Sequence, residues 1–225
     1  MSAAAFDFHG ASLVADASGA LYWPAKETLA VADLHLEKGS AFAANGTLLP
    51  PYDSRETLRR LRIVLRRHRP RRVICLGDSF HDTAAADRLA VEDAATLRRL
   101  TKAHEWIWIT GNHDPEPMTG IGGVFLDSLA LGPVTFRHQA SPESLAGEIS
   151  GHLHPVAVVS ARGRGLRRRC FVGDGRRLVM PAFGAYAGGL NVRHRAFAMF
   201  ESRFTAHLLG RDRVHAFSAA HCLPD

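Results

Sequence analysis

Residues 72–81 have the sequence RVICLGDSFH, in which a short apolar run is followed at once by polar residues. A run of this length bounded by polar residues predicts a buried strand. Residues 28–33, TLAVAD, and residues 105–110, EWIWIT, have the same design. The sequence therefore predicts three buried strands, each of which ends in a polar loop.

Two helices are expected between these strands. The first, residues 54–69, begins at a capping box of Asp53 and Glu56 and ends before Pro70. The second spans residues 87–104. Strands that alternate with helices indicate an α/β fold, and ligands in such folds collect at the carboxyl ends of the strands. We therefore expect the polar loops to form the functional site.

The second half of the chain is expected to be mostly β-structure. No repeat, low-complexity segment or linker interrupts the sequence, so we expect residues 1–225 to form a single domain. Further strands are expected at residues 124–131, 134–138, 156–161, 168–172, 178–180 and 196–200.

The composition excludes several classes of protein. With 46% hydrophobic and 22% charged residues, the chain is neither disordered nor collagen-like. No apolar run approaches the roughly 18 residues of a membrane helix, and Asp7 lies where a signal peptide would carry positive charge. We therefore expect no membrane association and a cytoplasmic location. Three cysteines without CxxC spacing predict ordinary thiols rather than disulfides or a zinc ribbon.

The charge balance favours a polyanionic partner such as DNA. Lys and Arg number 28 against 22 Asp and Glu, and only three of the 28 are lysines. A guanidinium group pairs bidentately with phosphate, although a GC-rich genome would also enrich arginine. Arginines cluster at 59–72, where acidic i+4 partners are nearly absent, and again at 162–169. Phosphate contact and a solvated surface both remain open for these clusters.

Histidine, aspartate and asparagine follow the expected strand ends in a fixed order. The motifs are DLH at 33–35, GDSFH at 77–81, GNHD at 111–114, an isolated His138 and GHLH at 151–154. Imidazole, carboxylate and amide donors without thiolate suit Mn²⁺, Fe or Zn²⁺ better than Ca²⁺ or a structural zinc. One motif alone is weak evidence in a chain with 13 histidines. The ordered set predicts a metal centre.

This set of motifs resembles that of the calcineurin-like metallophosphoesterase family. The resemblance implies a sandwich of two mixed β-sheets flanked by helices, and a binuclear metal-dependent hydrolase. The GDSFH motif is more similar to the nuclease branch than to protein phosphatases.

The match extends further along the chain. With PAFG at 181–184 and GG at 188–189, the sequence resembles the bacterial ligase-associated DNA damage response endonucleases. Such a resemblance implies a manganese-dependent endonuclease that cleaves single-stranded DNA in DNA repair. It also implies a functional link to an ATP-dependent DNA ligase and a helicase.

The resemblance also assigns seven metal ligands for two divalent ions, most simply Mn²⁺. The first ion would bind Asp33, His35, Asp78 and His154. The second would bind Asp78, Asn112, His138 and His152, so that the carboxylate of Asp78 bridges the two. Many relatives have glycine after the isolated histidine, whereas here Gln139 follows it.

The catalytic roles implied by the resemblance fall on the residues beside these ligands. His113 would be the general acid that protonates the leaving oxygen, and Asp114 would orient its ring. For His81, a role facing the substrate and a role in capping its loop both remain open. Two alternatives to DNA cleavage remain: hydrolysis of a small phosphodiester or nucleotide in a closed pocket, and a non-catalytic scaffold. The filled ligand positions argue against the scaffold.

Overall fold

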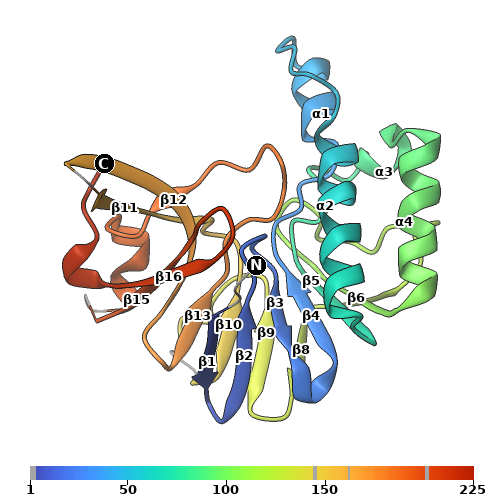
Figure 1. The fold of residues 1–225 in the computed structure, drawn as a ribbon. Helices are drawn as coiled ribbons and strands as arrows, with labels where there is room; N and C mark the ends of the chain where they lie inside the picture. Colours follow the sequence, from blue (N-terminus) through green and yellow to red (C-terminus); the bar gives the residue numbers. More distant parts are fainter. Residues whose placement is uncertain (1–3, 144–145, 162, 201–202) are drawn as a thin grey trace.

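The computed structural model describes residues 4–143, 146–161, 163–200 and 203–225. Two β-sheets share one hydrophobic core, and helices cover the outer face of the first sheet (Figure 1). Both sheets contain parallel and antiparallel pairs. The expected sandwich of two mixed sheets flanked by helices is therefore confirmed.

The first sheet has seven strands in sequence order. Its first four strands are antiparallel neighbours, and the pairs from β4 to β7 are parallel. The three strands expected from the sequence are β4, β5 and β6, at the centre of the parallel half. The strands are β1 (Ala4–Phe8), β2 (Ala11–Ala15), β3 (Leu21–Trp23), β4 (Thr28–Val31), β5 (Arg72–Leu76), β6 (Glu105–Ile109) and β7 (Val124–Leu126).

The second sheet has nine strands and contains most of the C-terminal half of the chain. Within it, β10 lies between β9 and β13 and is parallel to both. The strands are β8 (Ser128–Leu131), β9 (Val134–Arg137), β10 (Glu148–Ser150), β11 (Pro155–Ala161), β12 (Arg164–Gly173), β13 (Arg177–Val179), β14 (Leu190–Asn191), β15 (Thr205–Leu209) and β16 (Val214–Ser218).

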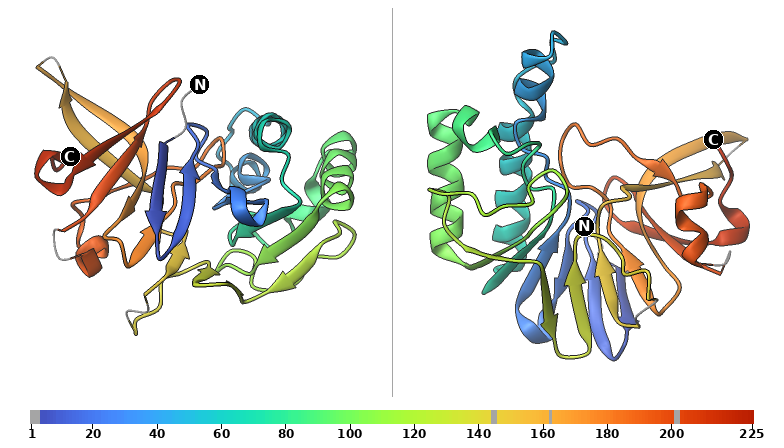
Figure 2. Two further views of the ribbon diagram at one scale, coloured as in Figure 1. Left: turned by 60° about the horizontal axis from the view of Figure 1, so that its bottom comes forward. Right: turned by 180° about the vertical axis from the view of Figure 1, so that it is seen from behind.

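The α-helices lie on the side of the first sheet that faces away from the second sheet. Helices α2 and α4 pack there over a second core cluster, while α1 projects from the body of the protein (Figures 1 and 2). Within the described ranges, no helix has the length and apolarity needed to span a membrane. The helices are α1 (Lys38–Ala44), α2 (Asp53–His68), α3 (Ala85–Arg88), α4 (Val91–Ala103) and the 3-10 helices η1 (Pro24–Lys26), η2 (Arg195–Phe200) and η3 (Ala219–His221).

The start of α2 differs from the expected capping box. Tyr52 is the N-cap residue, and its side chain makes no capping hydrogen bond. Asp53 is inside the helix, and its carboxylate accepts a hydrogen bond from the backbone N–H of Gly39 at 3.0 Å. The capping box was therefore a wrong prediction, because a tertiary contact with α1 claims the carboxylate that the box requires. The end of α2 before Pro70 is as expected.

Three other expected elements also differ. The strand expected at 124–131 is divided into β7, in the first sheet, and β8, in the second. The helix expected at 87–104 is divided into α3 and α4, with Leu89 and Ala90 in extended conformations between them. Residues 196–200 form part of η2 instead of a strand. Phe197 and Phe200 are three residues apart, so the 3-10 helix buries both on one face, and they pack in the same core cluster.

Candidate metal centre

The polar loops converge because their strands run in the same direction. Strands β4, β5 and β6 are parallel neighbours in the first sheet, and β9 and β10 are parallel in the second. Backbone bonds tie the loops together: Asp33 N–H donates to the carbonyl of Gly77 at 3.3 Å, and Gly151 N–H donates to that of His138 at 2.9 Å. The site is therefore held by both sheets.

The backbone is strained where the expected ligands lie. Nine described residues other than glycine have a positive φ, and five of them are expected ligands. Left-handed conformations cost free energy for residues with a Cβ, and they cluster at functional sites. The five are Asp33, His35, Asp78, His152 and His154.

The first expected ion site is formed by Asp33, His35 and His154, whose ligand atoms lie within 4.8 Å of one another. The Nε2 atoms of the two rings are 3.2 Å apart, and His154 Nε2 is 3.5 Å from a carboxylate oxygen of Asp33. Asp33 and His35 are buried. Two imidazole nitrogens at this distance need a proton or a cation between them.

The second expected ion site is formed in the same way by Asp78, His138 and His152. The Nε2 atom of His138 is 3.1 Å from His152 Nδ1, 3.4 Å from Asp78 Oδ2 and 3.0 Å from the amide oxygen of Asn112. All seven expected ligands therefore belong to one connected cluster.

Asp78 lies between the two groups. Its Oδ2 atom is 4.0 Å from His35 Nε2 and 3.4 Å from His138 Nε2, so one oxygen faces both groups. Its Oδ1 atom accepts a hydrogen bond from the backbone N–H of His113 at 2.9 Å. A carboxylate in this position is placed to bridge two cations.

The charges within this cluster are balanced only by histidines. Among the described residues, the ion-pair partners of Asp33 and Asp78 are all imidazoles. Burial by itself would lower the pKa of His138, but its hydrogen bond to Asp78 and the charges of Asp33 and Asp78 raise that pKa to about 9. Burial and the nearby His154 lower the pKa of His35 to about 3. Buried carboxylates in such a setting favour the binding of a cation.

A backbone carbonyl fixes the orientation of the His138 ring. His138 Nδ1 is 2.9 Å from the carbonyl oxygen of Leu76, which can only accept, so Nδ1 carries the proton. In the neutral ring the lone pair is then on Nε2, which lies 3.0 Å from the amide oxygen of Asn112 and 3.1 Å from Nδ1 of His152, so a cation placed among these three atoms would be within reach of all of them. Metal-binding histidines are commonly oriented by such a bond.

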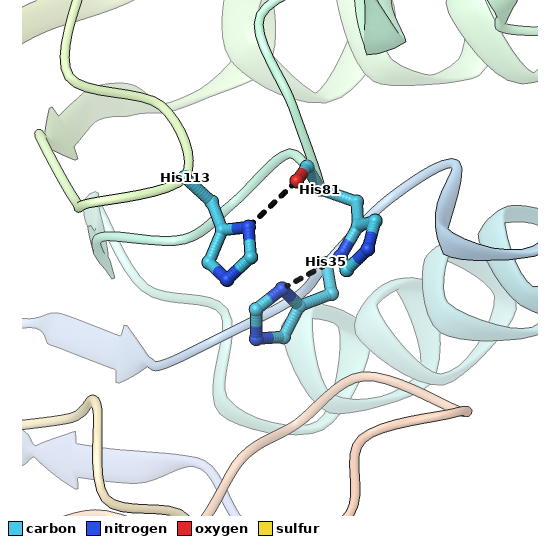
Figure 3. Close-up of side chains that lie close together, drawn as sticks. All are labelled: His35, His81 and His113. Atoms are coloured by element: carbon cyan, nitrogen blue, oxygen red, sulfur yellow. Dashed lines mark hydrogen bonds between the residues drawn. The ribbon is translucent and has the colours of Figure 1, made fainter. Parts of the chain in front are cut away.

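A third group of histidines borders the first ion site. His35, His81 and His113 face one another in Figure 3. The rings of His81 and His113 stack with centroids 4.9 Å apart, and His81 Nδ1 is 3.4 Å from His35 Nδ1. His113 Nδ1 donates to the carbonyl oxygen of His81 at 2.7 Å. His81 thus touches both a predicted ligand and the predicted general acid.

The carboxylate of Asp114 binds backbone N–H groups, whereas the sequence predicted that it would bind the ring of His113. Its buried carboxylate accepts backbone N–H groups of Gly111, Asp78, Ser79 and Phe80 at 2.8 to 3.1 Å. These bonds fasten the turn after β5 to the turn after β6. The prediction that Asp114 orients the ring of His113 is wrong, because the His81 carbonyl binds that ring. Burial, opposed by these hydrogen bonds, raises the pKa of Asp114 to about 6.

Glycines admit the close approach of these loops, which the sequence analysis did not recognise. A Cβ at Gly77, where φ is +71°, would overlap the ring of His138. A Cβ at Gly111 would overlap the backbone nitrogen of Asp78. Gly77 is the first residue of GDSFH and Gly111 the first of GNHD, so these two motifs already indicated where the backbone must pass close to another loop.

Most arginines of the cluster at residues 59–72 form ion pairs with acidic side chains. Arg59 and Arg60 bind Glu56, Arg67 binds Asp16, and Arg71 and Arg72 approach Glu105. Arg72 begins β5, whereas Asp78 follows its end, so they lie at opposite ends of the strand. In the second cluster, Arg164 to Arg169 belong to β12, and Arg162 lies outside the described residues.

Residues 27–167 match the family model described as Calcineurin-like phosphoesterase. The match spans more than half of the sequence, so the chain belongs to the calcineurin-like phosphoesterase family. The family resemblance found in the sequence is thereby confirmed. A comparison with curated proteins found no match.

Among solved structures, the nuclease MPE of Pseudomonas putida is similar to this chain, with 31% identity and a TM-score of 0.76. The alignment covers 96% of this chain and 100% of that one. The phosphoesterase YfcE of E. coli aligns over 85% of this chain and 98% of its own, with 12% identity and a TM-score of 0.43. The chain is thus a phosphoesterase by family, with a nuclease as a structural neighbour.

Proposed function

We propose that this protein is a binuclear, manganese-dependent endonuclease that cleaves single-stranded DNA during repair. The observation that carries the proposal is Asp78 Oδ2, which faces both ligand groups at the converging strand ends. The similarity to a nuclease over nearly the whole chain and the net charge of +6 support a polyanionic substrate. We further propose action in the cytoplasm, beside an ATP-dependent DNA ligase and a helicase.

The donor set fits two divalent ions. Buried carboxylates, imidazole lone pairs and the amide of Asn112 converge without an arginine or lysine in ion-pair contact with Asp33 or Asp78, within the described residues. Asp33, His35, Asp78 and His154 would hold one ion, and Asp78, Asn112, His138 and His152 the other. Ions bound there would activate a water molecule and neutralise charge on the phosphate.

His113 would deliver the proton to the leaving oxygen. Its Nδ1 proton is committed to the carbonyl of His81, so only Nε2 can exchange a proton with the substrate. The ring would therefore act from the cationic form and return to the neutral Nδ1–H form after transfer. A sugar alkoxide is a poor leaving group and needs this proton. His81 and Asp114 would hold the ring and the loops in place.

The proposal is tested with circular single-stranded DNA, duplex plasmid and a panel of small nucleotides, each with Mn²⁺, Mg²⁺ or chelator. We expect Mn²⁺-dependent conversion of circular single-stranded DNA to linear fragments, since only an endonuclease can open a circle. Activity confined to small nucleotides would replace the proposal with the alternative of a small-molecule phosphodiesterase. DNA cleavage that persists in chelator would refute the metal centre.

A further inference from the structure

Helix α1 leaves the metal centre directly and projects into solvent (Figure 1). It begins at Lys38, three residues after His35, and its base is held firmly. The hydroxyl of Ser54 accepts the backbone N–H of Glu37 at 2.8 Å and donates to the Glu37 carboxylate at 2.7 Å. Gly39 N–H donates to Asp53 at 3.0 Å. The residues of α1 are therefore held at a fixed position relative to the site.

The projecting segment is unusually apolar at its surface. Of the seven large hydrophobic side chains that are exposed in the described residues, three lie within residues 42–52. Phe42 is 37% exposed, Leu48 87% and Tyr52 62%. Exposed apolar side chains gathered beside a site commonly mark a binding surface. Because Tyr52 and Leu48 are further along the segment, Phe42 is the one closest in sequence to the metal ligands.

Phe42 is connected to the site by a series of rings. Its ring centroid is 5.9 Å from that of His81, and His81 stacks on His113 at 4.9 Å. The ammonium group of Lys38 lies 5.8 Å from the centre of the Phe42 ring. A partly exposed aromatic ring and a cation thus stand together beside His81, which stacks on the proposed general acid.

We propose that Phe42 stacks on an unpaired base next to the scissile phosphate and thereby selects single-stranded DNA. This inference rests on the proposed nuclease function. Every base has a π-face that can stack on an aromatic side chain, which makes such contacts independent of sequence. In a duplex, neighbouring bases already cover both faces, so Phe42 contributes only when the strand is unpaired. Lys38 adds a positive charge beside the ring that suits the adjoining phosphate.

The surroundings favour DNA over a protein as the occupant of this surface. Lys38 and His81 lie beside the ring, and the chain has a net charge of +6. A second copy of this chain would bring the same cationic surface against itself. A polyanion with flat apolar rings matches both the charge and the aromatic face.

The experiment measures kcat/KM on a single-stranded oligonucleotide for the Mn²⁺-loaded wild type, Phe42→Ala and Phe42→Trp. Leu48→Ala is the control, because it removes an exposed apolar side chain from the same segment away from the ring series. We expect Phe42→Ala to lose about fivefold or more, the lower range for one stacked base, and Phe42→Trp to retain activity. Leu48→Ala should match the wild type.

A series of oligonucleotides with one abasic site each identifies the stacked base. At one position relative to the cleaved bond, removing the base should slow the wild type as much as Phe42→Ala does. On that substrate, Phe42→Ala should cost less than about twofold further, since the two changes remove the same contact. A variant that is merely misfolded would instead lose the same factor on every oligonucleotide.

Several results would overturn the inference. One is a Phe42→Ala variant that cleaves intact single-stranded DNA as fast as the wild type, or that loses an equal factor at every abasic position. Another is a wild-type dimer, measured by light scattering, that Phe42→Ala dissociates, which would make the surface an interface between copies. If the wild type fails to cleave DNA at all, the proposed function itself fails, and this outcome is separate from the others.

Discussion

Asp16 and Asp78 are both buried carboxylates, but the protein neutralises them differently. Asp16 is bound through both oxygens by Arg67 at 2.7 and 2.9 Å, and by His68 at 2.8 Å. The ion-pair partners of Asp78 among the described residues are the imidazoles of His35 and His138. A guanidinium is always charged, whereas an imidazole can give up its proton.

The comparison shows how a buried carboxylate becomes either a structural element or a metal ligand. Around Asp16, the permanent cation completes the charge balance within the chain. Around Asp78, neutral imidazoles would direct lone pairs at the same space as the carboxylate, so a divalent ion completes the balance. The number of charged residues in a stretch of sequence therefore does not identify the functional site. The kind of side chain that pairs with each buried carboxylate identifies it.

The largest expected effect is that of Asp78→Ala. Loss of the bridge should remove both ions, and because metal ions contribute several kcal/mol of transition-state stabilisation, activity should fall at least about 10³-fold. DNA and bis(4-nitrophenyl) phosphate should be affected together. Metal content measured by atomic emission provides the check, with Asp33→Ala as the comparison that should retain more metal. An Asp78→Ala protein with two ions per chain and normal cleavage would show that Asp78 does not bridge.

His113→Ala should separate proton transfer from metal binding. Loss of a general acid typically costs about 10² to 10⁴ in rate, and the cost depends on the leaving group. We therefore expect DNA cleavage to fall by such a factor while bis(4-nitrophenyl) phosphate is largely spared, because nitrophenolate leaves without a proton. Kinetics on both substrates with metal content measured give the test. Equal losses on both, with both ions retained, would make His113 a phosphate-binding residue instead.

Asp114→Ala sharpens the comparison, because the partners of this buried carboxylate among the described residues are backbone N–H groups. Its four backbone donors would be left unpaired, and each unsatisfied buried donor costs about 1 to 3 kcal/mol unless water reaches it. We expect the free energy of unfolding to fall by about 4 kcal/mol or more, the lower end for four donors, and activity to fall equally on both substrates. Urea unfolding and the two assays measure this. A loss confined to DNA, with normal stability, would restore the predicted role beside His113.

Asp16→Asn should change stability without changing catalysis. Burial by itself would raise the pKa of Asp16, but hydrogen bonds from His68, Ser18 and Arg67 outweigh it and hold that pKa below its usual value. Between the folded and unfolded pKa values the unfolded state binds more protons, so this stabilisation is present above about pH 4 and is lost as pH falls.

Urea unfolding of the wild type and Asp16→Asn tests this at pH 7 and at decreasing pH. We expect the variant to be less stable by about 2 kcal/mol at pH 7, a typical value for hydrogen bonds to a charged group, and the difference to shrink below about pH 4. A difference that stays constant with pH would show that the charge of Asp16 is not what stabilises the cluster.

The smallest effect is expected for three arginines of α2 and its C-cap. Arg62, Arg66 and Arg69 form no ion pair within the described ranges, and the helix ends at the start of β5, about 17 Å from the metal end of that strand. The triple change of these residues to glutamine should alter kcat/KM on DNA less than about twofold, because no phosphate contact is lost. A salt dependence that flattens by about 0.7 per removed charge would instead show that they contact phosphates.

The sequence predicted the parts of the fold that local pattern determines. The apolar runs before Asp33, Asp78 and residue 111 are strands β4, β5 and β6 as expected. Strands β1 to β3 were not expected, although Leu13 and Leu21 are fully buried there. Those strands are short and antiparallel, and the core that buries them is assembled from segments distant in sequence.

The sequence also contained the residues of the metal centre. The family resemblance carried by the motifs assigned seven ligand positions, and the structure brings all seven together, because polar residues that follow parallel strands meet at one edge of a sheet. The sequence likewise determined a basic chain rich in arginine. It contained no information on which arginines have acidic partners.

Only the tertiary structure decided the roles that depend on contacts between distant segments. It placed Asp114 on backbone N–H groups of the preceding loop rather than on His113, and it gave Asp16 an arginine 51 residues away. It also placed Phe42 against His81 at the rim of the site. Local pattern sets which face of a strand or helix a side chain occupies. The partner that a carboxylate or a ring finds across the core is fixed only when the sheets pack, because that contact depends on the register and twist of every element between the two residues.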